Sequence, residues 1–169
     1  MIRSQLLGNL LMGLVLLALG LASQSRGAGG LGKSDKSDSK VKATATTTKP
    51  GADGKQTVTI TLDINAGWHI YANPVDAEGF VNNRDFEKSN RTTVSITAAD
   101  KLTADIIYPV GKLKVEGEYK AKIYQDRVTI LAKVQRTMGD SSPLQVSINV
   151  NACDKNTCLP QGTVKLTIP

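Results

Sequence analysis

The chain has 169 residues, of which 40% are hydrophobic and 4% aromatic, and its formal net charge is +6 at pH 7. Its positive residues are scattered among acidic ones, and the densest stretch, GKLKVEGEYKAKIYQDR, mixes both signs. Nucleic-acid binding requires a concentrated basic face, so this distribution argues against a nucleic-acid partner.

The N-terminus has the three-part pattern of a secretory signal peptide. A positive end that contains Arg3 precedes an apolar run from Leu6 to Ala22, and Gly20-Leu21-Ala22 fits the small-residue rule for cleavage. We therefore expect residues 1–22 to be a signal peptide and the mature protein to be periplasmic or secreted. The alternative is an uncleaved membrane anchor, because the apolar run reaches the lower limit for spanning a bilayer.

The next segment, residues 23–39, consists of Ser, Gly, Lys and Asp with hardly an apolar side chain. Such a composition buries too little surface to offset its ordering entropy, so we expect a flexible linker. Residues 40–169 differ in character and are numerous enough for one compact domain with a single core.

The domain shows the alternation of apolar and polar residues that is typical of half-buried strands. Val, Ile and Thr are abundant in these segments, and turn-forming sequences such as KPGADGK, YPVGK and TMGDSSP separate them. No long segment has helical periodicity. We therefore expect an all-β fold, an antiparallel sandwich of immunoglobulin-like type. The main strand candidates are QTVTITLDI, TTVSIT, ADIIYP, RVTILAKV, LQVSINV and TVKLTI.

Cys153 and Cys158 are the two cysteines of the chain, and they flank the turn-forming sequence DKNT. Their sulfurs are expected to face each other across the mouth of a hairpin at one end of the sandwich. Closing so short a loop contributes about 2 kcal/mol in the chain-entropy model, against nearly 5 for a loop of 100 residues. An inert staple and a redox-active pair both remain open on spacing alone.

The stretch GWHIYANP contains two alternating pairs, Trp68 with Ile70 and His69 with Tyr71. One pair is expected to face the core, and the other then shares the opposite face. A soft metal site that combines His69 with the two cysteines is an alternative, but a lone histidine without a second ligand motif argues against it. We expect no metal and no cofactor. The sequence also lacks a nucleotide-binding loop or a hydrolase triad, so no small-molecule substrate is indicated.

Three segments, GWHIYANP, KIYQDRVTILAKV and NACDKNTCLPQGTVKL, occur in an order and at intervals that resemble the N-terminal periplasmic domain of the DsbD family of thiol:disulfide interchange proteins. The resemblance covers residues 40–169. It implies an immunoglobulin-like fold and a reversible Cys153–Cys158 disulfide that takes electrons from a membrane-embedded reductant and passes them to thioredoxin-like proteins. The chain would then be one component of a thiol–disulfide oxidoreductase system.

The resemblance also implies roles for individual residues. Cys158 matches the attacking thiol, whereas His69 and Tyr71 match positions where the family places aromatic side chains around the cysteines. The region of the family's aromatic cap loop reads KVEGEYKAKIY here, and Tyr119 is its ring. This stretch is shorter than in the best-known member, which puts capping in question. Ordinary strand roles for His69 and Tyr71 remain open.

Two accounts of function follow from these observations. In the first, the chain is a thiol–disulfide carrier that meets its membrane and thioredoxin-like partners in trans, because the sequence ends at Pro169. In the second, it is a secreted immunoglobulin-like interaction module whose disulfide is purely structural.

Overall fold

The computed structural model describes residues 35–169. The expected signal peptide and residues 23–34 of the expected linker lie outside the described residues. Within residues 35–169, no helix combines the length and the apolar character needed to cross a membrane.

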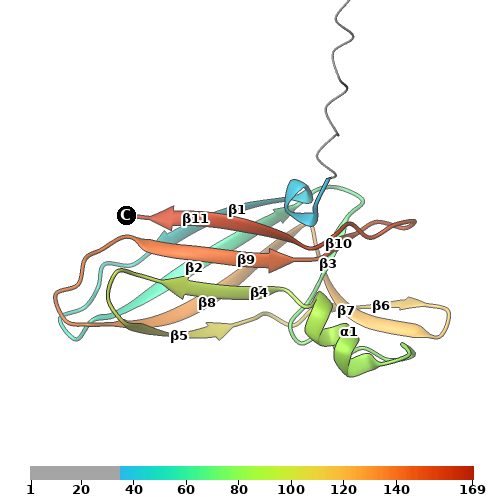
Figure 1. Ribbon diagram of the computed structural model, residues 1–169, viewed down its shortest axis with the longest axis horizontal. Helices are drawn as coiled ribbons and strands as arrows, with labels where there is room; N and C mark the ends of the chain where they lie inside the picture. Colours follow the sequence, from blue (N-terminus) through green and yellow to red (C-terminus); the bar gives the residue numbers. More distant parts are fainter. Residues whose placement is uncertain (1–34) are drawn as a thin grey trace, which may run out of the picture. The chain divides into compact units, whose positions relative to one another are not determined.

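Two antiparallel sheets face each other and form a sandwich (Figure 1). One sheet has the order β1–β2–β8–β5, with β1 at Val41–Thr47, β2 at Lys55–Ile64, β8 at Arg127–Arg136 and β5 at Leu102–Ile107. The other has the order β11–β9–β4, with β11 at Gly162–Ile168, β9 at Leu144–Val150 and β4 at Thr93–Thr97. This arrangement confirms the predicted all-β, immunoglobulin-like sandwich.

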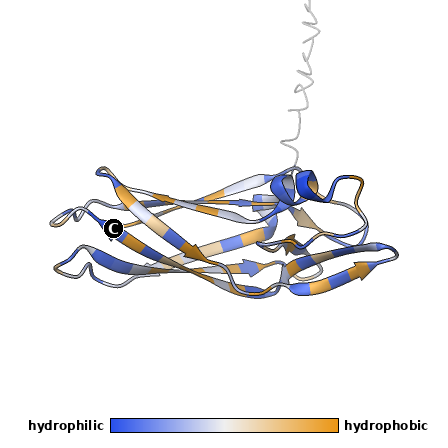
Figure 2. Ribbon diagram, turned by 90° about the horizontal axis from the view of Figure 1, so that it is seen from below, coloured by the Kyte–Doolittle hydropathy of each residue, from blue (hydrophilic) through white to orange (hydrophobic). Residues whose placement is uncertain are grey.

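The core lies between these sheets and consists of the apolar residues of the alternating segments. Apolar and polar residues alternate along the strands, as Figure 2 shows by colour. Every second residue of β2, β8 and β9 is buried, so one face of each strand supplies the core. The predicted inward residues of these strands are all buried: Val58, Ile60, Leu62, Ile64, Val128, Ile130, Ala132, Val134, Leu144, Val146, Ile148 and Val150.

A third sheet, with the order β10–β3–β7–β6, continues the sandwich at one end. Its strands are β10 at Ala152–Cys153, β3 at His69–Tyr71, β7 at Tyr119–Gln125 and β6 at Lys112–Glu116. Asp126, at a φ of 59°, separates β7 from β8, so a nearly continuous strand passes from the third sheet into the first. Residue 151 separates β9 from β10 in the same way and carries the chain from the sandwich into the third sheet.

One helix, α1 at Asn83–Asn90, lies at the same end as the third sheet (Figure 1). Asn82 caps it by accepting the backbone N–H of Asp85. The segment that carries α1 leaves β3 and returns beside it, because the Thr92 N–H donates to the Tyr71 carbonyl at 3.1 Å. No residue of the helix is fully buried, which explains why the strand-rich pattern of the sequence gave no sign of it.

The fold also includes residues that the sequence assigned to the linker. Ser37–Lys40 forms a short 3₁₀ helix, and Ser37 is fully buried. The Ser37 hydroxyl accepts the Ala152 N–H at 2.8 Å and donates to the Pro160 carbonyl at 2.9 Å. The expectation of a linker through residue 39 is therefore corrected: polar side chains order this segment through hydrogen bonds, without apolar burial.

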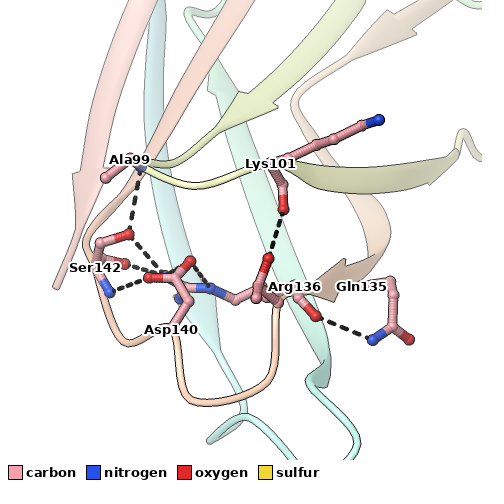
Figure 3. A network of polar contacts seen from close by, with 7 residues as sticks. Ala99, Lys101, Gln135, Arg136, Asp140 and Ser142 are labelled. Carbon is pink, nitrogen blue, oxygen red and sulfur yellow. Dashed lines mark hydrogen bonds and ion pairs between the residues drawn. The ribbon is translucent and has the colours of Figure 1, made fainter.

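A buried ion pair holds the loop after β8, near the opposite end of the sandwich (Figure 3). Arg136 donates to the Asp140 carboxylate at 3.0 and 2.9 Å, and both side chains are 5% exposed. The Ser142 N–H donates to the same carboxylate at 2.8 Å. Arg136 occupies the last inward-facing position of β8, where the preceding inward residues are apolar. Its buried charge is compensated by the ion pair with Asp140.

Candidate functional site

The cysteines form a disulfide, Cys153–Cys158, at the end of the sandwich that carries the third sheet. The two residues also face each other in an antiparallel bridge, and the Leu159 N–H donates to the Ala152 carbonyl at 2.9 Å. The disulfide thus closes the mouth of a hairpin, as the spacing predicted.

The turn between the cysteines is held by a single carboxylate. Asp154 accepts the N–H groups of Asn156 and Thr157, both at 2.7 Å. These backbone donors lower the pKa of Asp154 below its ordinary value, because they favour the ionised form. The four-residue turn therefore has its own hydrogen bonds and does not depend on the disulfide alone for its shape.

The two sulfur-bearing residues differ in their access to solvent. Cys153, which pairs with His69 as part of β10, is 2% exposed, whereas Cys158 is exposed. A thiolate that approaches from outside can therefore reach the Cys158 side of the bond and is kept from the Cys153 side. Access is one of the factors that decide which sulfur of a disulfide is attacked.

Two predicted neighbours, His69 and Tyr71, lie on the face of β3 opposite Ile70. Ile70 is fully buried in the main core, and Trp68 packs partly against that core while Lys40 lies over its ring. The Tyr71 hydroxyl is 3.8 Å from Cys153 Sγ, within reach of an O–H···S hydrogen bond. The alternation in GWHIYANP thus places His69 and Tyr71 on the side of the disulfide.

Both of these side chains are uncharged near neutral pH. Burial lowers the pKa of His69 to about 4, and the positive charge of Lys114 acts in the same direction. Burial raises the pKa of the Tyr71 hydroxyl, and the negative charge of Glu116 adds to this effect. Cys153 therefore faces a neutral imidazole and a protonated phenol that can donate a hydrogen bond.

An aromatic cluster extends from Tyr71 away from the disulfide. Tyr71 makes an edge contact with Phe86 of α1 at 5.1 Å between ring centroids, and Phe86 stacks on Phe80 at 3.7 Å. Phe80 in turn contacts Tyr119 at 5.1 Å. We call Tyr71, Phe80, Phe86 and Tyr119 the aromatic cluster.

The positions of Phe80 and Phe86 beside Tyr71 were not predicted from the sequence. They belong to the segment between β3 and β4, which lacks alternation and gives no local signal of its position. Their proximity to Tyr71 results from the closed path of that segment. The chain has only two phenylalanines, and their proximity to each other in sequence was the one indication that they could form an aromatic contact.

The third predicted neighbour, Tyr119, stands at the tip of the β6–β7 hairpin and is 46% exposed. It reaches the site through Phe80 and lines a small cavity of about 40 Å³ with His69, Tyr71 and Phe80. Lys114 and Glu116 of β6 line the same cavity and form an ion pair at 2.5 Å. The stretch KVEGEYKAKIY is thus a β-hairpin beside the site, with Tyr119 as its ring.

A metal site is not evident in the described part of the chain. Among residues 35–169, no group of three or more His, Cys, Asp or Glu side chains is placed to hold a metal ion.

The fold and the site define a class of protein: an immunoglobulin-like domain that carries a hairpin disulfide at one end, with one cysteine buried and the other exposed. Residues 38–168 match the family described as "Thiol:disulfide interchange protein DsbD, N-terminal". The chain belongs to this family, which confirms the resemblance seen in the sequence. No curated protein matches the chain.

A solved structure shares the fold at low sequence identity. The N-terminal periplasmic domain of ScsB from Proteus mirabilis is 13% identical, with a TM-score of 0.57 over 79% of this chain. The match covers 48% of the ScsB chain, so the present chain spans about half of its length.

Two further structures come from Neisseria meningitidis. The DsbD N-terminal domain in the reduced form is 14% identical, with a TM-score of 0.44 over 73% of this chain and 82% of its own. A complex between the DsbD and PilB N-terminal domains is 12% identical, with a TM-score of 0.45 over 74% and 80%.

Proposed function

We propose that the chain is a periplasmic thiol–disulfide carrier whose Cys153–Cys158 disulfide opens and closes during electron transfer. Its partners are a membrane-embedded thiol reductant and thioredoxin-like proteins. Membership of the DsbD N-terminal family supports thiol–disulfide interchange. The observation that carries the proposal for this chain is the asymmetry of the pair, with Cys158 exposed and Cys153 buried beside Tyr71.

This asymmetry divides the chemistry between the two cysteines. A thiolate of the reductant attacks Cys158 Sγ, the Cys153–Cys158 bond breaks, and its electron pair leaves on Cys153 as a thiolate. The Tyr71 hydroxyl is placed to donate a hydrogen bond to that buried thiolate, which otherwise lacks solvation. A second thiol of the reductant then attacks the mixed disulfide and releases Cys158, so the pair is reduced by two electrons.

The reduced pair passes its electrons on by the reverse chemistry. The Cys158 thiolate attacks the disulfide of an oxidised thioredoxin-like partner and forms a mixed disulfide with it. Cys153 then loses its proton and attacks Cys158 Sγ, which re-forms the intramolecular bond and releases the partner as a dithiol. Cys158 is therefore the residue that joins each partner, and Cys153 is the residue that resolves the complex with the thioredoxin-like partner.

Exposed apolar side chains around the site support an encounter between proteins. Tyr119, Val115 and Val81 are 46%, 56% and 109% exposed, and they lie on the β6–β7 hairpin and next to Phe80. Apolar groups grouped around a reactive centre are typical of a transient docking surface.

Trapping of the mixed disulfide tests this division of roles. The full chain with Cys153→Ser, mixed with a thioredoxin-like protein that keeps only its exposed cysteine, activated as a mixed disulfide with a small aromatic thiol, should accumulate a covalent complex through Cys158 as the small thiol leaves. The matched variant Cys158→Ser should give little complex, because its remaining thiol is buried. Non-reducing electrophoresis and mass spectrometry measure both, and equal trapping by the two variants would overturn the assignment.

A further inference from the structure

A chain of side-chain amides runs from helix α1 to Cys153. The Asn90 amino group donates to the Phe86 carbonyl at 2.8 Å, and the Asn151 amino group donates to Asn90 Oδ1 at 2.7 Å. Asn151 Oδ1 then lies 3.7 Å from Cys153 Sγ. The last turn of the helix is thus connected to the buried sulfur through two asparagines.

The helix carbonyl determines the direction of the whole chain of amides. A backbone carbonyl can only accept, so Asn90 must direct its amino group toward Phe86 and its oxygen toward Asn151. Asn90 Oδ1 can only accept as well, so Asn151 must direct its amino group toward Asn90. The oxygen of Asn151 is therefore left facing the sulfur.

An oxygen acceptor distinguishes between the two protonation states of a reduced Cys153. A thiol can donate S–H to Asn151 Oδ1, whereas a thiolate meets a lone pair at the same position. Tyr71 acts in the opposite direction, because its hydroxyl donates a stronger hydrogen bond to a thiolate than to a thiol, so a preference for the thiol comes from Asn151. Cys158 is exposed, and water can solvate its thiolate.

We propose that Asn151, oriented by Asn90 and helix α1, is a positioning residue that keeps the proton of the reduced pair on Cys153 and leaves Cys158 to ionise first. The proposal rests on the proposed function, in which the pair is reduced and reoxidised in turn. When the pair loses one proton to solvent, the charge lies on the accessible sulfur. That sulfur is the one that must attack the partner's disulfide.

The other titratable groups around the site do not determine which of the two cysteines ionises first. His69, paired with Cys153, has a pKa of about 4 and is neutral when thiols titrate. Lys114 and Glu116 of β6 form an ion pair, so their charges largely cancel. From the turn, the Asp154 carboxylate is held by two backbone N–H groups, and Lys155 is exposed. Glu87 of α1 accepts the Ala77 N–H at 2.7 Å.

The test changes the orientation of Asn151 without touching the residues beside the sulfur. In the full chain with Cys158→Ser, the ionisation of Cys153 is followed by NMR through the ¹³Cβ shift of this residue. Asn90→Ala removes the acceptor and lets Asn151 turn its amino group toward the thiolate. The ionisation constant of the Cys153 thiol should then rise about threefold or more, the effect of one weak S–H···O hydrogen bond.

The matched control is Asn90→Asp, which retains an acceptor for the Asn151 amino group. In this variant the ionisation constant of Cys153 should not rise, and Asn151→Asp, with a carboxylate beside the sulfur, should lower it. An unchanged value in Asn90→Ala, or an equal rise in Asn90→Asp, would overturn the role of Asn151. The proposed exchange function is judged separately, from the potential of the unaltered cysteine pair.

Discussion

The burial of His69 in the folded protein disfavours protonation of its imidazole. Its side chain is buried beside Cys153, and its pKa of about 4 is below the ordinary value of 6.5 mainly because of burial. Well above pH 6.5 the imidazole is neutral in both the folded and the unfolded chain, so His69 adds no pH dependence to the free energy of unfolding there. Between pH 6.5 and 4 the unfolded chain binds the proton more readily, and stability declines.

Replacing His69 with Gln should remove this decline. We expect the free energy of unfolding of the wild-type protein to fall by about 2 kcal/mol between pH 6.5 and pH 4 through this residue, and that of His69→Gln to fall less. Urea unfolding at a series of pH values measures the difference. Parallel curves for the two proteins over this range would contradict the burial argument.

Asp140, at the other end of the sandwich, shows the same direction of linkage in a lower range of pH. Hydrogen bonds from Ser142 and the contact with Arg136 lower its pKa below the ordinary value of 3.8. Its contribution to stability is therefore present above pH 3.8 and is lost as the pH falls through the lowered pKa of the folded state. Asp140→Asn should destabilise the protein at pH 7 and make unfolding less dependent on pH in acid. Glu118→Gln, at an exposed turn, is the control, and an identical acid profile for both variants would argue against the Arg136–Asp140 pair.

At the scale of elements, α1 is held by few contacts. None of its residues is fully buried, and it is joined to the rest of the domain through Phe86 in the aromatic cluster, the Glu87 carboxylate and Asn90. Removing the Phe86 ring should therefore loosen the helix and uncover Tyr71 while the sandwich stays intact.

Phe86→Ala is expected to cost about 1 to 2 kcal/mol, less than a fully buried phenylalanine, because the side chain is half-buried. Amide hydrogen exchange should accelerate in residues 83–90 and leave β2 and β8 protected. Val81→Ala, at a fully exposed position next to Phe80, is the matched control. Uniform acceleration across all strands would show instead that α1 is an integral part of the core.

The elements also show how much of the structure the sequence could predict. The alternation in β2, β8 and β9 determined both the strands and the residues that face the core, because one face of each strand is buried. The strand β1 was missed, since VKATATT replaces large apolar residues with Ala and Thr. The helix α1 and the 3₁₀ helix at Ser37–Lys40 were missed because hydrogen bonds and caps, rather than apolar faces, hold them.

The candidate site was predictable to the extent that its residues are close in sequence. Cys153 and Cys158 flank one turn, and His69 and Tyr71 alternate along one strand. Phe86, Asn90 and Asn151 approach one another only through tertiary structure, because the segment between β3 and β4 folds back on β3. No local pattern encodes such a return.

At the scale of the whole molecule, the disulfide is a minor contributor to stability compared with the core. It closes a hairpin with a sequence separation of 5, whereas the core joins both sheets through residues such as Ile60 and Ile130. Replacing both cysteines with Ala should lower the free energy of unfolding by about 2 kcal/mol or less. Ile130→Ala alone should cost about 2 to 5 kcal/mol. Urea denaturation compares the two, and a larger loss from the cysteine variant would favour a structural staple.

The central claim is that the Cys153–Cys158 pair is redox-active, and its midpoint potential tests this claim most directly. The purified protein would be equilibrated in graded thiol buffers, alkylated and weighed by mass spectrometry. A midpoint above about −250 mV would place the pair among exchange-active disulfides, which is the result we expect. A midpoint below about −300 mV, with slow reduction, would identify an inert bridge and favour a binding module with a structural disulfide.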